Sequence, residues 1–268
     1  MVHLPTLDRR VPNTDLLLAC PAVRGLGTII NLVTVALGGG AGVLLGDRLP
    51  ESMRRTIMQG LGLVTLAVAI GGLEPLYDAD KGLRRFIILI ASIILGGLIG
   101  EALRLEERLE GVGETLRGRF GASRDGRPVT AGPSNFVEGF VTASTIFCVG
   151  PLTVLGAVED GLGGSIRLLA VKSALDGFAA VGLASVFGAG VLASLLTIAV
   201  LQGTLTLLAW LIEPLLSAEA LAQLGAVGSL LILGIGLRLL DIARIRVVNL
   251  LPAVLLGSVA ARLLDRVL

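Results

Sequence analysis

Long charge-free runs dominate the hydrophobic pattern of this chain. Residues 25–46 (GLGTIINLVTVALGGGAGVLLG) and residues 177–212 contain no Asp, Glu, Lys or Arg. An apolar stretch of about 18 residues or more is long enough for a helix to cross a bilayer. The pattern therefore predicts an all-α fold, a polytopic bundle of transmembrane helices.

The same criterion, applied along the whole chain, predicts about eight spans. They cover residues 26–45, 56–75, 85–103, 136–157, 167–187, 191–212, 221–240 and 246–264. The last is the weakest, because it is short and contains Asn249 and Pro252. A count of seven spans is therefore the alternative.

One long polar segment, residues 101–134, divides the apolar runs. Its first half, as far as Phe120, carries leucines among charged residues, which favours a helix along the membrane surface or an extension of the third span. Its second half has the composition of a flexible linker. We expect four parts: a disordered N-terminal extension (1–24), a first transmembrane unit of about three spans (25–105), an amphipathic segment with linker (106–134), and a second unit of four to five spans (135–268).

Glycine-rich interruptions occur at corresponding places in the two units. Residues 31–55 align with 142–167 at a shift of about 111–113, which matches the glycines at 38–40 with Gly150-Pro151. Proline costs a helix interior about 3 kcal/mol. Broken helices at matching positions of an inverted repeat point to the midplane site of a transporter. The pattern predicts such a repeat; a chance alignment of glycine-rich runs is the alternative.

Composition narrows the chemistry. Charged residues make up only 16% of the chain and the net charge is +1, so nucleic acid is not an expected partner. The single histidine and two cysteines have no metal-ligand spacing, which disfavours His/Cys metal sites and leaves any metal unknown. No Ser-His-Asp set or dinucleotide motif occurs. We expect no enzyme activity and no cofactor.

Several glycines are spaced for close helix packing. Gly42 and Gly46, like Gly96 and Gly100, follow the small-xxx-small pattern by which membrane helices approach one another. Small-residue faces of this kind would also permit a homo-oligomer.

The strongest candidates for chemistry are Lys172 and Asp176, near the middle of the fifth predicted span. A charge at the bilayer centre costs about 2.5–3.5 kcal/mol on insertion scales. At a spacing of four residues the two side chains share one helix face and can neutralise each other. Two interpretations stay open: Asp176 couples transport to a proton or cation with Lys172 as its partner, or the pair is a structural ion pair.

Polar residues near the predicted breaks complete the predicted site for an ion or solute. Each polar side chain alone is more typical of hydrogen bonding between helices. The predicted binding residues are Asp176, Lys172, Asn31, Gly39, Gly150, Pro151, Thr145 and Gln59. Acidic residues at span ends, among them Glu159 and Asp160, are expected to be solvated at the membrane interface.

Three segments carry a family resemblance: residues 25–72, the run FCVGPLTVLGAVEDGLGG, and the VKSALDG segment. Together they resemble the YdfK/YqgA-like prokaryotic membrane proteins, a family classed under a domain of unknown function. The resemblance covers the chain from about residue 25 to its end. It implies a multi-pass inner-membrane protein and supplies no catalytic residues.

These observations predict a secondary transporter or channel for an ion or small polar solute in the bacterial cytoplasmic (inner) membrane. Its expected partners are the lipid bilayer and that ion or solute. The alternative is a membrane scaffold or sensor that acts through residues 101–134. Twelve Lys and Arg residues lie on the side of the long linker against nine on the other, which favours a cytoplasmic linker.

Overall fold

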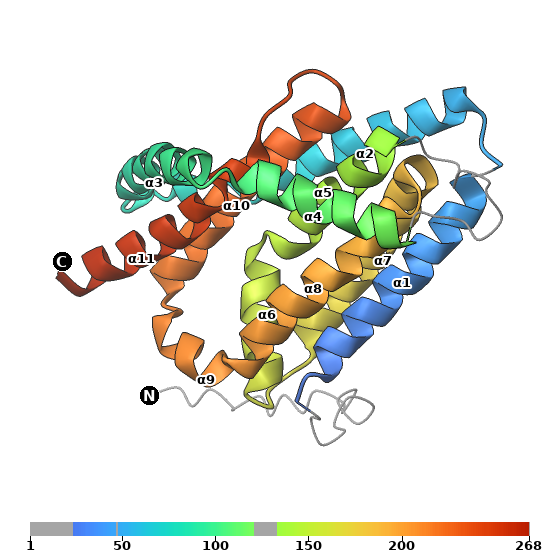
Figure 1. Ribbon diagram of the computed structural model, residues 1–268. Helices are drawn as coiled ribbons and strands as arrows, with labels where there is room; N and C mark the ends of the chain where they lie inside the picture. The colour runs from blue at the N-terminus through green and yellow to red at the C-terminus, as the bar shows by residue number, and fades with distance from the viewer. Residues whose placement is uncertain (1–23, 47, 121–132, 268) are drawn as a thin grey trace, which may run out of the picture.

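The computed structural model describes residues 24–46, 48–120 and 133–267, and within them it contains helices and no strand (Figure 1). The prediction of an all-α polytopic membrane bundle is thereby confirmed. The predicted extension (1–24) lies outside the described residues except for Arg24, and so does most of the predicted flexible linker.

The helices follow one another through short loops. In chain order they are α1 (Leu26–Gly46), α2 (Glu51–Gly71), η2 (Glu74–Tyr77), α3 (Gly82–Ala102), α4 (Leu105–Phe120), α5 (Pro133–Cys148), α6 (Pro151–Gly161), α7 (Arg167–Phe187), α8 (Gly190–Leu207), α9 (Ala209–Ile212), η3 (Glu213–Leu215), α10 (Ala218–Leu239), η4 (Val247–Leu250) and α11 (Pro252–Val267).

Seven segments of the described chain are long and apolar enough to cross a membrane, and α5 with α6 makes the eighth crossing. The axes of α5 and α6 differ by 64°. Phe136 in α5 lies against Gly190 at the start of α8, and Gly161 at the end of α6 lies against Thr206 near the end of α8. The pair therefore runs the whole length of α8, which makes it one broken span rather than a loop that returns to the same side.

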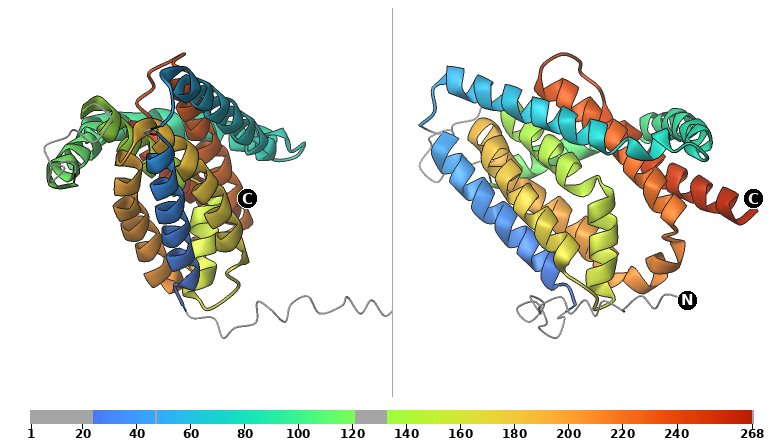
Figure 2. Two further views of the ribbon diagram at one scale, coloured as in Figure 1. Left: turned by 90° about the vertical axis from the view of Figure 1, so that its right-hand side faces the viewer. Right: turned by 180° about the vertical axis from the view of Figure 1, so that it is seen from behind.

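The spans pack in two groups (Figures 1 and 2). One group contains α1, α5–α6, α7 and α8; the other contains α2, α3, α10 and α11, and α10 also touches α5 and α6. α1 therefore packs in a different group from α2 and α3, the helices that follow it in the sequence. The spatial groups follow a different division from the two sequence units, and the inverted repeat stays a prediction.

The first span is not broken at residues 38–40, so that prediction was wrong. α1 is one continuous helix from Leu26 to Gly46. A Cβ atom added at Gly38 would collide with the carbonyl oxygen of Gly177, and one added at Gly42 would collide with that of Val181. The glycines allow two parallel helices, α1 and α7, to touch along their backbones, and such packing needs no break.

The predicted packing roles of Gly42, Gly46, Gly96 and Gly100 are confirmed. Gly46 lies against the backbone of Ser185 in α7, in register with Gly42. In the second group, Gly96 lies against Ala253 and Gly100 against the carbonyl of Asn249. The same spacing therefore joins helices in both groups.

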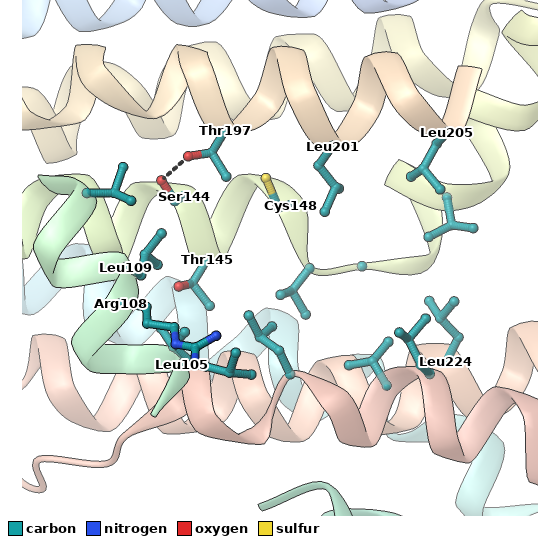
Figure 3. A pocket seen from close by; sticks show the side chains of 18 residues that line it. Leu105, Arg108, Leu109, Ser144, Thr145, Cys148, Thr197, Leu201, Leu205 and Leu224 are labelled. Atoms are coloured by element: carbon teal, nitrogen blue, oxygen red, sulfur yellow. Dashed lines mark hydrogen bonds between the residues drawn. The ribbon is translucent and has the colours of Figure 1, made fainter. Parts of the chain in front are cut away.

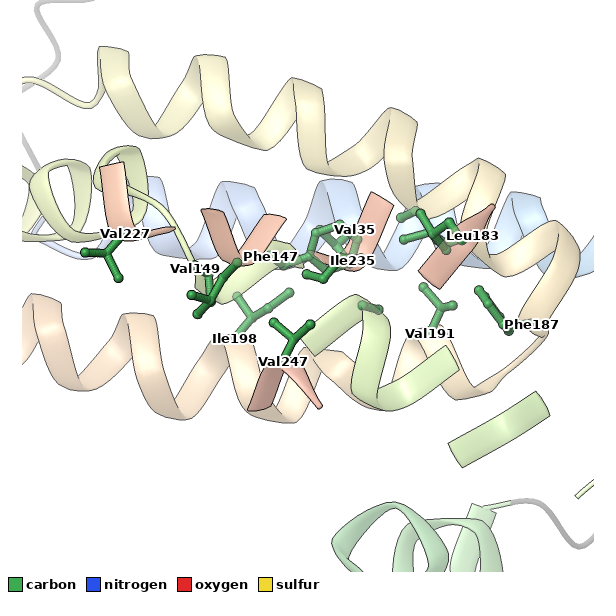
Figure 4. Close-up of a cluster of buried hydrophobic side chains, with 14 of the residues drawn as sticks. Val35, Phe147, Val149, Leu183, Phe187, Val191, Ile198, Val227, Ile235 and Val247 are labelled. Carbon is green, nitrogen blue, oxygen red and sulfur yellow. The ribbon is translucent and has the colours of Figure 1, made fainter. Parts of the chain in front are cut away.

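Buried apolar side chains fill the space between the groups (Figure 4). Val35, Phe147 and Leu183 come from the first group, and Val227 and Ile235 come from α10. Because lipid tails are as apolar as these side chains, tight packing rather than escape from water holds such a core together. This core places α10 beside the break between α5 and α6.

Adding one methyl group at Gly38 should weaken the protein. We expect Gly38→Ala to lower the free energy of unfolding by about 1–3 kcal/mol, the usual cost of overpacking, because α1 must move away from α7. Thermal unfolding in detergent measures this. Gly40→Ala is the matched control, since a Cβ there meets no atom within 4 Å. Equal melting temperatures for the two variants would show that the close approach of α1 to α7 contributes little to stability.

Candidate functional site

The break between α5 and α6 follows from two residues. Gly150 has φ 154° and ψ 152°, a backbone conformation that only glycine adopts readily. Pro151 then begins α6, where a missing N–H costs nothing because the first helical turn leaves that donor unpaired. The Thr153 hydroxyl donates to the carbonyl of Phe147 at 3.4 Å and so satisfies a backbone acceptor freed by the break. The predicted break at Gly150-Pro151 is confirmed.

A buried ion pair lies on α7 near this break. The Lys172 ammonium contacts the Asp176 carboxylate, and the two residues are only 5% and 8% exposed. Asp176 is midway along α7, so the pair lies deep in the membrane. Both halves of the broken span, α5 and α6, pack against α7. The helix that carries the ion pair therefore borders the break.

Two buried amides extend the ion pair into a four-residue polar cluster. Asn31 of α1 donates from Nδ2 to Oε1 of Gln202 in α8 at 2.8 Å, and its side chain lies close to the Asp176 carboxylate. Both amide residues are at most 1% exposed. Among the described residues, Asn31 Oδ1 and Gln202 Nε2 have no hydrogen-bond partner. One acceptor and one donor thus remain for a bound polar group beside the charges.

One end of this half of the bundle is organised by Asp160, which is buried rather than solvated as predicted. Its carboxylate accepts hydrogen bonds from the backbone N–H groups of Gly27 (3.2 Å) and Thr28 (3.1 Å). A negative charge suits the free N–H groups and positive dipole end of α1. The Thr28 hydroxyl also bonds that of Thr206 in α8 at 3.0 Å. Asp160 therefore caps α1 from the end of α6.

A cavity of about 490 Å³ lies on another side of the break (Figure 3). Its lining is mostly leucine and valine from α4, α5, α6, α8, α10, η4 and α11. Ser144 hydrogen-bonds Thr197 at its wall at 3.0 Å, as the dashed line marks. Neither Lys172 nor Asp176 lines this cavity. Its chemistry suits an apolar ligand rather than an ion.

The structure thus divides the predicted binding residues. Asn31, Lys172 and Asp176 come together, whereas Thr145 and Gly150 line the apolar cavity and Pro151 begins α6 beside it. Gly39 packs against Leu192 of α8, which is a structural role. Gln59 does not join the site, because it is exposed on α2.

Gln202 is the residue missing from the predicted set. In the sequence, the only signal for Gln202 is that a glutamine lies inside the apolar run 177–212. Gln59 gives the same signal, because it also lies in a predicted span. The contact between α1 and α8 distinguishes the two glutamines.

The profile of a family described as "Protein of unknown function (DUF554)" matches residues 26–261, which include every helix of the site. The chain belongs to the DUF554 family. It is 32% identical over 234 residues to the "Uncharacterized membrane protein YdfK" of Bacillus subtilis (strain 168), covering 87% of this chain and 94% of that protein. It is 34% identical over 232 residues to the "Uncharacterized protein YqgA" of Escherichia coli (strain K12), with the same coverage. No solved structure matches the chain.

A second polar network holds this DUF554 protein together near α4. Glu106 is 7% exposed; its carboxylate pairs with Arg238 at 3.3 Å and accepts from the backbone N–H of Val248 at 3.3 Å. Asn249 accepts from the Glu106 N–H at 2.8 Å and donates to Glu101 at 2.6 Å. These bonds fix α4 to the ends of α3 and α10 and to η4.

Removing the Asp160 carboxylate should destabilise α1. We expect Asp160→Ala to cost about 1–3 kcal/mol in unfolding free energy, because two buried backbone donors lose their acceptor. Thermal unfolding in detergent measures the effect, with Glu159→Ala as the neighbouring control. If both variants melt at the same temperature, the cap does not contribute to stability.

The Glu106 carboxyl should make stability depend on pH. Burial, the largest cause, raises its pKa above the ordinary value, although Arg238 opposes the shift. The folded protein therefore binds this proton more tightly than the unfolded chain, so its contribution to stability falls as pH rises through the raised pKa. We expect unfolding measured between about pH 4 and pH 7 to show this fall, and Glu106→Gln to flatten it. If Glu106→Gln leaves the pH dependence of stability the same as in the wild type, the Glu106 carboxyl is not its source.

Proposed function

We propose that this DUF554 protein is a secondary transporter or channel for an ion or small polar solute. In this proposal Asp176 binds the coupling proton or cation, and Lys172 is the competing positive charge. The observation that carries the proposal is the buried cluster of Asn31, Lys172, Asp176 and Gln202 beside a broken span.

The energetic cost of burying Lys172 and Asp176 favours a functional role for this ion pair rather than a purely structural one. Desolvating two charges costs several kcal/mol each, and a buried ion pair is often no more stabilising than apolar residues of the same size. Lys172 and Asp176 lie deep in the membrane, where charged residues usually mark ion or proton pathways. The two amide atoms without partners supply further polar contacts for a bound solute.

The geometry suggests how coupling would work. The Lys172 ammonium is paired with the Asp176 carboxylate. A proton or cation that binds Asp176 must therefore displace the ammonium. The released ammonium then needs another negative partner, which a solute carboxylate or the negative dipole end of α5 can provide. Because α6 is separated from α5 by Gly150, the half-helix can tilt without distorting α5. Exchange of partners by Lys172 would thus be linked to movement at the break.

We further infer that the protein resides in the bacterial cytoplasmic membrane with α4 on the cytoplasmic side. The arginines of α4, among them Arg108, Arg117 and Arg119, support this orientation under the positive-inside rule.

Transport in proteoliposomes tests the proposal. We would impose a potassium diffusion potential and follow a trapped pH dye while adding mixtures of amino acids, organic acids, polyamines or sodium. We expect protein-dependent proton or solute flux that Asp176→Asn reduces at least about tenfold, since binding to the coupling carboxylate is lost. Glu114→Gln is the matched control, because Glu114 forms an exposed pair with Arg117 at 3.0 Å.

Loss of folding must be separated from loss of function. Asp176→Asn alone leaves Lys172 without its charged partner, which is expected to cost about 3–5 kcal/mol, so its melting temperature should fall. The double variant Lys172→Met/Asp176→Asn removes both charges and should recover most of that stability while remaining inactive. A stable double variant with wild-type flux would show that the pair is structural. Wild-type protein without flux under every mixture would favour the scaffold alternative.

A further inference from the structure

Two cavities meet along one face of α8. The cavity beside the break, about 490 Å³, and a second one of about 510 Å³ share Leu109 and Val112 of α4 and Thr197, Leu201 and Leu205 of α8. From Thr197 to Leu205 the α8 backbone rises about 12 Å. The cavities are therefore two neighbouring grooves that start at α4 and run into the membrane on either side of the same α8 residues.

Both grooves reach the lipid-facing surface. Among the shared side chains, Val112 is 44% exposed and Leu201 is 39% exposed, and Leu255 of the first groove is 71% exposed. In a membrane protein such apolar surface faces acyl chains. The grooves also have the size typical of ligand sites, about 300–1,000 Å³, and mostly apolar linings.

A positive charge lies where the grooves begin. Arg108 of α4 lines the first groove, one turn from the shared Val112, and Figure 3 shows its guanidinium beside Leu105 and Thr145. Arg108 is exposed and forms no ion pair with any residue that the structure describes, unlike Arg117 on the same helix, which pairs with Glu114. A free arginine at the membrane surface attracts anionic lipid headgroups.

We propose that the paired grooves bind one anionic phospholipid, with an acyl chain in each groove and its phosphate at Arg108. Two apolar grooves that converge below one cation match a headgroup carrying two chains better than they match a single-chain amphiphile. In this position the first chain contacts Val149, Gly150 and Val154, the residues on both sides of the helix break. The lipid would therefore fill the space into which α6 could tilt. This inference does not depend on the transport proposal.

Native mass spectrometry of the detergent-purified protein tests lipid binding. We would add dioleoylphosphatidylglycerol, dioleoylphosphatidylethanolamine, single-chain oleoyl-lysophosphatidylglycerol or glycerol phosphate, and compare retained adducts. We expect the two-chain phosphatidylglycerol to be retained best. Leu201→Trp, which fills both grooves, should weaken its binding about tenfold or more, because excluding even two buried methylenes is sufficient for that loss. Leu207→Trp is the control, since Leu207 is 78% exposed on α8 and lines neither groove.

The headgroup contact has its own test. Arg108→Gln should reduce the preference for phosphatidylglycerol over phosphatidylethanolamine about fivefold, which is the effect of one cation near the membrane surface. The control variant Arg119→Gln should leave this preference unchanged. Arg119 is exposed on the same helix and lines neither groove.

Either of two results would overturn the proposal. Equal phosphatidylglycerol binding by the Leu201 and Leu207 variants would show that the grooves hold no chain. Binding of glycerol phosphate or the lysolipid as tight as that of the two-chain lipid would assign the site to a headgroup or a single-chain ligand. Melting temperatures of all variants, measured without added lipid, identify any variant that merely fails to fold.

Discussion

The backbone contact between α1 and α7 is the interaction on which the polar cluster depends. Gly38, Gly42 and Gly46 let the two parallel helices approach until side chains are excluded between them. That approach brings Asn31 of α1 against Asp176 of α7, and α8 then adds Gln202. Without the glycines the helices would stand farther apart, and the charged pair would lose the amide that borders it.

A bilayer allows a broken helix only where the freed backbone groups are satisfied or face protein. The break at Gly150 meets this condition through the Thr153 hydroxyl, and the two half-helices pack against α7, α8 and α10. It also leaves unequal surroundings on its two sides: a charged cluster toward α7, and an apolar groove toward α4 and α11. A movement of α6 would change both surroundings at once, which is how a lipid in the groove could influence the polar cluster.

The two ends of the molecule are fixed by carboxylates that bind across helices. Asp160 caps α1 from α6, and Glu106 ties α4 to Arg238 and η4. A further buried pair, Arg85 with Glu219 at 2.9 Å, joins α3 to α10. These contacts lie near helix ends, so they hold the two groups of spans in place and leave the middle of the bundle to the candidate site.

The sequence by itself determined the class of the protein, its spans, the break at Gly150-Pro151 and the i, i+4 charge pair, because each depends on residues close together in the chain. It could not distinguish glycines that break a helix from glycines that admit a neighbour, since both occur as glycine-rich apolar runs; only the packing of α7 decided this for residues 38–40. It could not choose Gln202 over Gln59 or place Asp160 inside the protein, because those outcomes depend on which helices lie side by side. Tertiary structure also separated the charged cluster from the apolar grooves, which in sequence lie on overlapping spans.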